Sequence, residues 1–78
     1  MKYEKEKVDE YTLALLYLVM HNKDEYGARA WKGFDWDTMN RLHDKGYIGN
    51  PIGKAKSVSV TLEGRKKAKE LFYSYFVR

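Results

Sequence analysis

The sequence predicts one small α+β domain made of three helices and a two-stranded β-hairpin. A mainly apolar stretch from Val8 to Met20 has helical length, and a second amphipathic stretch stops at Gly46. An alternating segment, residues 57–62, then leads into a third helical pattern. A chain of 78 residues forms one domain and buries only about 60–65% of its unfolded surface. We expect a single domain over residues 1–78, with a frayed N-terminus at 1–7.

The first predicted helix begins near Val8 or Asp9 and is apolar on almost every side. Apolar side chains occupy much of the surface of the helix, and one stripe of it comprises Val8, Tyr11, Leu15, Leu18 and Val19. Such a helix must be covered on nearly all sides, and the rest of the chain is short. We therefore expect a second copy to cover it, as a homodimer. The predicted dimer interface comprises Leu13, Leu16, Tyr17, Met20, Leu71, Phe72, Tyr75 and Phe76.

The middle of the chain combines an irregular segment with a second helix. Residues 22–34 are polar and are interrupted by Gly27 and Gly33, which indicates a loop. Asp35 is suited to cap a helix that stops at Gly46, where a glycine adopts the left-handed conformation at low cost.

The C-terminal part predicts a hairpin and a last helix. An extended segment at residues 47–49 is followed by turn residues and a basic tip, and Val58 and Val60 then alternate with polar residues in a second strand. Thr61 is a candidate N-cap for the last helix, although a full capping box would have Glu or Gln where this chain has Gly64. The apolar stripe of this helix comprises Ala68, Leu71, Phe72, Tyr75 and Phe76.

Positive charge is concentrated near the C-terminus. Residues 1–49 carry 8 basic and 9 acidic side chains, whereas residues 50–78 carry 7 basic and 2 acidic ones. This asymmetry fits a surface that faces a polyanion, and it fits equally well a solvated lysine face. The predicted nucleic-acid-contacting residues are Lys54, Lys56, Arg65, Lys66, Lys69 and Arg41.

The stretch from Trp36 to Phe76 resembles the winged-helix superfamily. The residues that carry the likeness are Leu42-His43-Asp44-Lys45-Gly46-Tyr47-Ile48 and Val60-Thr61-Leu62-Glu63-Gly64-Arg65. The resemblance implies that the helix before Gly46 is a recognition helix, that the loop between the two strands is a wing, and that the protein binds DNA as a regulator. The segment 29–37, taken together with 42–46, is also similar to a small bacterial family of uncharacterised proteins, from which no activity follows.

Two features depart from the winged-helix pattern. A helix-turn-helix needs a helix before the recognition helix, and the glycine-interrupted residues 22–34 leave that helix reduced or missing. The recognition helix would also present Asp35, Asp37 and Asp44, whose carboxylates repel phosphates. We therefore expect a minimal winged-helix-like domain that contacts double-stranded DNA through the wing and the last helix.

Two further groups of residues have alternative interpretations. Trp31, Phe34 and Trp36 can stack on single-stranded bases, or they can anchor the irregular segment in the core. His21 and His43 each lie near an aspartate, but the chain has no cysteine and no zinc-motif spacing, so we expect no metal.

The sequence contains no recognisable catalytic arrangement. Ser57, Ser59 and Ser74 lie outside any nucleophile elbow, and the glycines flank a proline turn and not a phosphate loop. We expect no enzymatic activity, no cofactor and no small-molecule substrate.

The apolar run from Leu13 to Met20 is shorter than the about 20 residues that span a bilayer. The absence of cysteine gives no sign of an oxidising compartment, so we expect a cytoplasmic protein without membrane contact. Two hypotheses about function follow. One is a DNA-binding or transcription-regulating module, and the other is a dimeric protein–protein interaction module without nucleic-acid binding.

Overall fold

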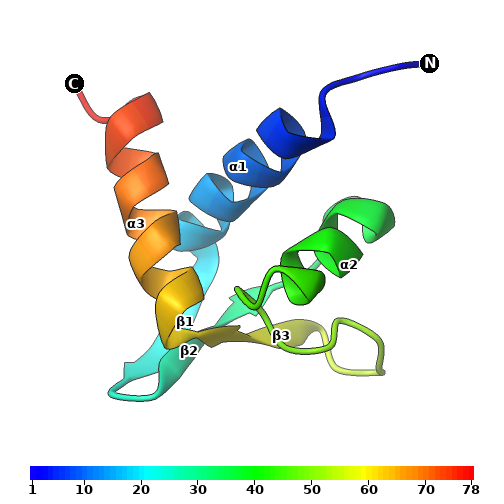
Figure 1. The fold of residues 1–78 in the computed structure, drawn as a ribbon. Helices are drawn as coiled ribbons and strands as arrows, with labels where there is room; N and C mark the ends of the chain where they lie inside the picture. Colours follow the sequence, from blue (N-terminus) through cyan, green and yellow to red (C-terminus); the bar gives the residue numbers. More distant parts are fainter.

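The computed structural model describes residues 1–78, which fold into three helices and one sheet. The helices are α1 (Lys5–Leu16), α2 (Trp36–Asp44) and α3 (Leu62–Phe76), and the strands are β1 (Met20–Asp24), β2 (Gly27–Trp31) and β3 (Ser57–Thr61). A short 3-10 turn, η1 (Tyr17–Val19), joins α1 to β1. The strands form an antiparallel sheet in the order β1-β2-β3, and the helices lie on one side of it (Figure 1). The predicted α+β class with three helices is confirmed, but the sheet has three strands and not two.

The predicted irregular segment, residues 22–34, contains most of a β-hairpin, so that prediction is wrong. Asp24 Oδ1 accepts hydrogen bonds from the N–H groups of Tyr26 and Gly27, at 2.8 and 3.1 Å, and these bonds fix the turn. Gly27 has a φ of 151° and passes so close to the carbonyl oxygen of Val60 that a Cβ atom would overlap it. This glycine therefore permits strand pairing and does not interrupt the regular secondary structure.

Helix α2 is capped at both ends as predicted. Asp35 accepts a hydrogen bond from the N–H of Thr38 at 3.1 Å. Hydrogen bonds from Thr38 also hold the pKa of Asp35 below its ordinary value. Gly46 has a φ of 81°, which is the left-handed conformation expected after the end of a helix.

The extended segment at residues 47–49 does not form the second strand of a two-stranded wing. A single bridge links Ile48 to β3, and the N–H of Gly49 donates to the carbonyl of Ser59 at 2.9 Å. Pro51 has no N–H group and cannot continue this ladder. β3 pairs along its full length with β2 instead, because β2 offers an uninterrupted row of partners.

The last helix, α3, begins at its predicted cap. Thr61 Oγ1 accepts a hydrogen bond from the N–H of Gly64 at 2.9 Å, which confirms Thr61 as the N-cap. Gly64 lies so close to the carbonyl oxygen of Tyr47 that a Cβ atom would overlap it. Neither α3 nor any other helix has the length and apolar content that a membrane span requires.

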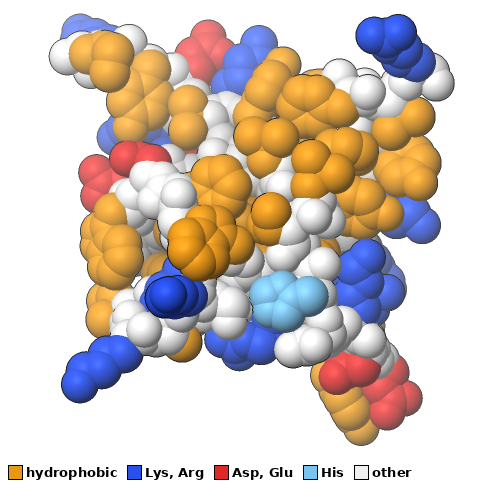
Figure 2. All heavy atoms as spheres, turned by 180° about the vertical axis from the view of Figure 1, so that it is seen from behind, with side chains coloured by type: hydrophobic (Ala, Val, Ile, Leu, Met, Phe, Trp, Pro, Cys, Tyr) orange, Lys and Arg blue, Asp and Glu red, His pale blue; other side chains and the backbone are white.

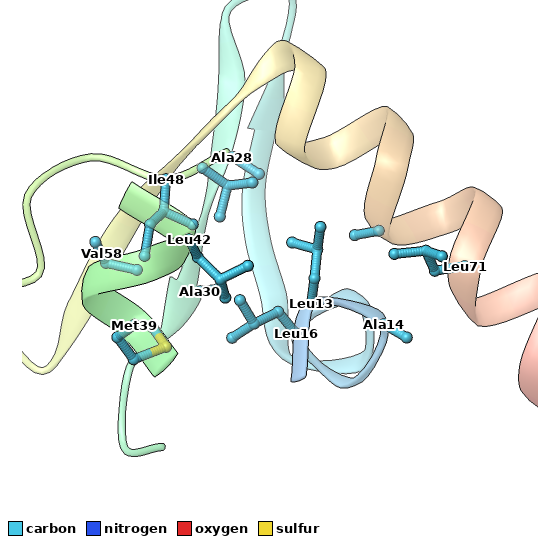
Figure 3. Close-up of a cluster of buried hydrophobic side chains, with 12 residues drawn as sticks. Leu13, Ala14, Leu16, Ala28, Ala30, Met39, Leu42, Ile48, Val58 and Leu71 are labelled. Atoms are coloured by element: carbon cyan, nitrogen blue, oxygen red, sulfur yellow. The ribbon is translucent and has the colours of Figure 1, made fainter. Parts of the chain in front are cut away.

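The core lies between the helices and the sheet (Figure 3). Its buried hydrophobic side chains are Leu13, Ala14, Leu16, Ala28, Ala30, Met39, Leu42, Ile48, Val58, Val60, Ala68 and Leu71. The valines of β3 point inward as predicted. Helix α1 begins at Lys5 and not near Val8, with Glu6 in its first turn, where a carboxylate interacts favourably with the helix dipole.

Candidate functional site

Six aromatic side chains from α1, η1 and α3 pack in a continuous series, which we call the aromatic array. Its members are Tyr11, Tyr17, Phe72, Tyr73, Tyr75 and Phe76. Tyr11 stacks on Tyr75 with ring centroids 4.7 Å apart, and it meets the ring of Phe76 edge-on at 5.9 Å. Phe72 then connects Phe76, at 5.5 Å, to Tyr17, at 5.3 Å. Phe72 and Phe76 share one side of α3 because they are one helical turn apart.

The aromatic array is only partly covered by the rest of the chain. Four of its members keep between 38% and 51% of their surface exposed, namely Tyr11, Tyr73, Tyr75 and Phe76. Leu15 and Leu18 continue the stripe that begins at Tyr11, and they are 39% and 64% exposed. Figure 2 shows hydrophobic side chains gathered over the upper part of this side of the molecule, where α1 and the end of α3 lie. We call the aromatic array together with Leu15 and Leu18 the α1–α3 face.

The predicted dimer interface coincides only partly with the α1–α3 face. Leu13, Leu16 and Leu71 are buried in the core of the same chain, so a partner cannot reach them. The reason is that α2 and α3 pack on α1, whose buried side chains include Leu13 and Leu16. Among the other predicted interface residues, three are partly buried and pack against the core, namely Tyr17, Met20 and Phe72. Tyr75 and Phe76 are exposed. The predicted interface lacked four members of the face, namely Tyr11, Leu15, Leu18 and Tyr73, although the first three belong to the apolar stripe predicted for the first helix.

A network of ion pairs around the buried carboxylate of Asp9 fastens α1 to α2. The Asp9 side chain is 2% exposed and accepts hydrogen bonds from Arg41 Nε and Lys45 Nζ, both at 2.8 Å. Lys45 also binds the carboxylate of Glu6 at 2.9 Å. Arg41, which the sequence suggested for nucleic-acid contact, is committed to this internal contact. Nothing local in the sequence connects Asp9 to residues on α2, so the network was not foreseen.

The network keeps Asp9, Arg41 and Lys45 charged. Burial acts to raise the pKa of Asp9, but hydrogen bonds from Arg41 and Lys45 outweigh it and hold this pKa below the ordinary value of 3.8. The hydrogen bond to Asp9 raises the pKa of Arg41. Burial acts to lower the pKa of Lys45, but hydrogen bonds to Asp9 and Glu6 raise it above 10.5. None of these groups is therefore poised for proton transfer near neutral pH.

The other predicted nucleic-acid-contacting residues form two separate groups. Lys54 and Lys56 lie in the loop before β3, whereas Arg65, Lys66 and Lys69 lie on α3 after it. The length of β3 separates the groups by roughly 16 Å. They do not form one continuous strip.

The α3 group borders a hollow of about 400 Å³ between α3 and the β1–β2 hairpin, which we call the basic hollow. Its lining includes four basic side chains, Lys23, Arg65, Lys66 and Lys69, and two acidic ones, Asp24 and Glu25. Arg65 Nη1 donates to the carbonyl of Asp24 at 2.8 Å. The ammonium groups of Lys23 and Lys69 lie 5.4 and 5.8 Å from the ring centroids of Tyr17 and Tyr73. Lys23 is not among the predicted nucleic-acid-contacting residues, because the sequence did not predict the hairpin that carries it.

The clustered aromatic residues between the end of β2 and the start of α2 have different environments. Phe34 packs against the core, whereas Trp31 and Trp36 are about half exposed, so the anchoring interpretation holds for Phe34 alone. His21 and His43 each have Nδ1 within hydrogen-bond distance of a backbone carbonyl, at 3.2 and 3.0 Å. No group of three metal-ligating side chains is present.

The fold and these surfaces define a small α+β domain whose helices cover one face of a three-stranded sheet and leave a half-exposed aromatic surface. Residues 4–78 match the family model described as "Domain of unknown function (DUF6429)", and the chain belongs to this family. It is 45% identical to the "Uncharacterized protein y4hR" of Sinorhizobium fredii (strain NBRC 101917 / NGR234), over the full length of both chains. No solved structure matches the chain.

Proposed function

We propose that this protein is a non-catalytic, dimeric interaction module in which the α1–α3 face of one copy packs against the same face of a second copy. The observation that carries the proposal is the aromatic array, whose rings are ordered against one another and yet half exposed. Tyrosine and phenylalanine are enriched at the centres of protein interfaces because they bury a large area with few rotatable bonds.

The exposed area of the α1–α3 face is close to what a dimer needs. An aromatic side chain buries about 200 Å², so the exposed parts of the four open rings and the two leucines amount to roughly 500 Å². A standard interface takes about 800 Å² from each partner, and the side chains around the face can supply the remainder. The largest apolar patch on a monomer is typically about 300–600 Å², which puts this face at the upper end.

The exposed end of α3 is a reason to infer that the partner bound to the α1–α3 face is a second copy of this chain. The buried residues of α3 stop at Leu71, and the helix continues to Phe76 with aromatic side chains whose rings meet those of Tyr11 and Tyr17. Antiparallel pairing of two α1–α3 units would form a four-helix layer with two-fold symmetry, in which each copy covers the end of α3 of the other.

Sedimentation equilibrium over an about hundredfold range of concentration tests this proposal. We expect a dimer for the wild type and a monomer for Tyr73→Glu combined with Phe76→Glu, with an unchanged helical signal in circular dichroism. Tyr26→Glu is the matched control, because Tyr26 is more exposed, at 80%, but lies on the hairpin turn. A wild type that stays monomeric at the highest concentration would refute the proposal.

A second candidate function, contact with the phosphates of double-stranded DNA, is supported by the basic hollow. Lys23, Lys66 and Lys69 have no carboxylate partner, and each lysine that meets a phosphate releases counterions. The order α2, Gly46, β3, α3 also agrees with a winged-helix-like arrangement, although a hairpin occupies the place of the first helix of a helix-turn-helix.

Fluorescence anisotropy of a labelled duplex at low and at physiological salt tests this second candidate. We expect Lys66→Glu with Lys69→Glu to abolish binding, and Lys54→Glu with Lys56→Glu to change it less. An equal loss with both pairs would indicate attraction to net charge and not to the basic hollow.

A further inference from the structure

The face of the sheet that points away from the helices is open, and we call it the outer sheet face. Ala28 and Ala30 of β2 are buried in the core, so Arg29 and Trp31 lie on the opposite face. In the same way, the valines of β3 point inward and its serines point outward. The outer sheet face therefore carries side chains that the core does not need.

Arg29 lies in the middle of β2 on the outer sheet face, and β3 holds its side chain in place. Its Nε donates to Ser57 Oγ at 2.8 Å, and its Nη2 donates to the carbonyl of Ser57 at 2.9 Å. No carboxylate forms an ion pair with Arg29. A guanidinium donates more hydrogen bonds than these two contacts use, so a positioned part of it remains free to bind an anion.

Two exposed aromatic side chains flank Arg29 along β2. Trp31 is 49% exposed at the end of the strand, and Tyr26 is 80% exposed at the hairpin turn. Tyr26, Arg29 and Ser59 contribute to the lining of a shallow hollow of about 290 Å³. The extended backbone between Tyr26 and Trp31 spans roughly 16 Å, with Arg29 between the two rings.

The charge at the Trp31 end of the outer sheet face favours an anionic partner. The chain from residue 47 to residue 62 contains no aspartate or glutamate, and it includes the exposed side chains of Lys54 and Lys56. Lys56 directly precedes the residue of β3 that pairs with Trp31, so the basic loop adjoins the Trp31 end of the face. Asp24, which also lines the shallow hollow, uses Oδ1 to hold the hairpin turn.

We propose that the outer sheet face binds single-stranded nucleic acid, with bases stacked on Tyr26 and Trp31 and the phosphate backbone bound by Arg29. Lys54 and Lys56 extend the contact to phosphates beyond the Trp31 end. A single strand exposes the faces of its bases, and aromatic rings interleaved with cations are the surface that such a strand needs. A duplex keeps its base faces stacked inside and would leave both rings unused. The outer sheet face is separate from the α1–α3 face, so binding of nucleic acid is a function additional to self-association. One dimer could make both contacts at the same time.

The first test is fluorescence anisotropy with a labelled single-stranded oligonucleotide of mixed sequence and with the duplex of the same sequence. We expect the single strand to bind more tightly than the duplex, and binding to weaken as salt is added. Trp31→Ala should weaken binding of the single strand by about tenfold, since stacking on one aromatic ring contributes an effect of this size. Trp36→Ala, which removes a similarly exposed indole at the start of α2, should leave binding unchanged.

The second test reads the stacking directly and does not depend on whether Trp31→Ala folds. In Trp36→Phe, Trp31 is the only tryptophan, so its fluorescence should be quenched as the single strand is added. Arg29→Gln in the same background should reduce affinity several-fold while the quenching at saturation persists. Tighter binding of the duplex, or binding of the single strand without quenching, would overturn the proposal. These outcomes are independent of the oligomeric state, so they do not bear on the α1–α3 face.

Discussion

Helix α1 makes a polar contact with α2 on one side and an aromatic contact with α3 on the other. In the polar contact, the carboxylate of Asp9 is withdrawn from water and both of its oxygens are bound. In the aromatic contact, the rings of Tyr11, Tyr75 and Phe76 meet but stay about half exposed. A buried charge loses much stability when its partner is removed, whereas stacked rings keep most of their surface for another contact. The same helix thus carries one closed contact that fixes the fold and one open contact that is available to a partner.

Asp9→Asn tests the closed contact and should have the largest effect. The amide leaves Arg41 and Lys45 without their buried anion, and breaking a buried pair from one side costs about 3 kcal/mol. Urea unfolding measures this loss as a lower transition midpoint. Glu6→Gln is the control, because the Glu6 side chain is 82% exposed, and it should change the free energy of unfolding by less than about 0.5 kcal/mol. An Asp9→Asn protein as stable as the wild type would mean that the ion pairs do not hold α2.

Phe72→Ala addresses the inner edge of the aromatic contact. Phe72 packs against the core as well as against Tyr17 and Phe76, so truncation should lower the free energy of unfolding by about 2 kcal/mol. The neighbouring change, Tyr73→Ala, should cost less than about 0.5 kcal/mol because Tyr73 is half exposed. Thermal unfolding at a low protein concentration, where a dimer would dissociate, separates these effects from self-association. If the two changes lowered the free energy of unfolding equally, this would contradict the assignment of Phe72 to the core side and of Tyr73 to the solvent side of the aromatic contact.

The closed contact should make the stability of the protein depend on pH. The pKa of Asp9 is lower in the folded state than its ordinary value of 3.8, so folding is stabilised while Asp9 is ionised. This contribution is complete above the ordinary value and disappears as the pH falls through the lower folded-state pKa. The pKa of Lys45 is raised above 10.5, so its contribution is complete below that value and disappears at higher pH. Unfolding curves recorded across the acidic range should show a smaller loss of stability for Asp9→Asn than for the wild type.

Tyr75→Phe should have the smallest effect. The hydroxyl of Tyr75 donates to Glu10 Oε1 at 3.1 Å at an exposed position, and this contact raises the pKa of Tyr75. Water replaces an exposed hydrogen bond of this kind, so the midpoints of unfolding and of dimer dissociation should stay within measurement error. A clear loss of self-association would instead place the hydroxyl in the interface.

The sequence predicts the caps of α2 and α3 and the inner face of β3 well because their signals are local. Asp35, Gly46 and Thr61 occupy the caps predicted for them, and the alternation around Val58 and Val60 gives the correct inner face of β3. Each of these features depends on residues a few positions apart, where hydrogen bonding and backbone sterics are decided locally.

The β1–β2 hairpin and the ion-pair network could not be predicted from the sequence, for two different reasons. β1 is an edge strand with mostly exposed polar side chains, and β2 turns small alanines to the core, so neither has the usual alternation of large apolar residues. Asp9 meets its partners only after α2 has packed on α1, so its role depends on tertiary structure. The predicted interface included core leucines because an apolar surface does not reveal which neighbour covers it.

Two structural requirements conflict at Gly64, and the chain satisfies only one of them. A capping box would place a glutamate there, but the carbonyl oxygen of Tyr47 occupies the space that its Cβ atom would need. The chain therefore keeps the hydroxyl half of the box at Thr61 and gives up the carboxylate half. In a library randomised at this codon and selected for folded protein, glycine should be recovered almost alone. The same library at Gly46, where a Cβ atom would meet nothing, should also return asparagine.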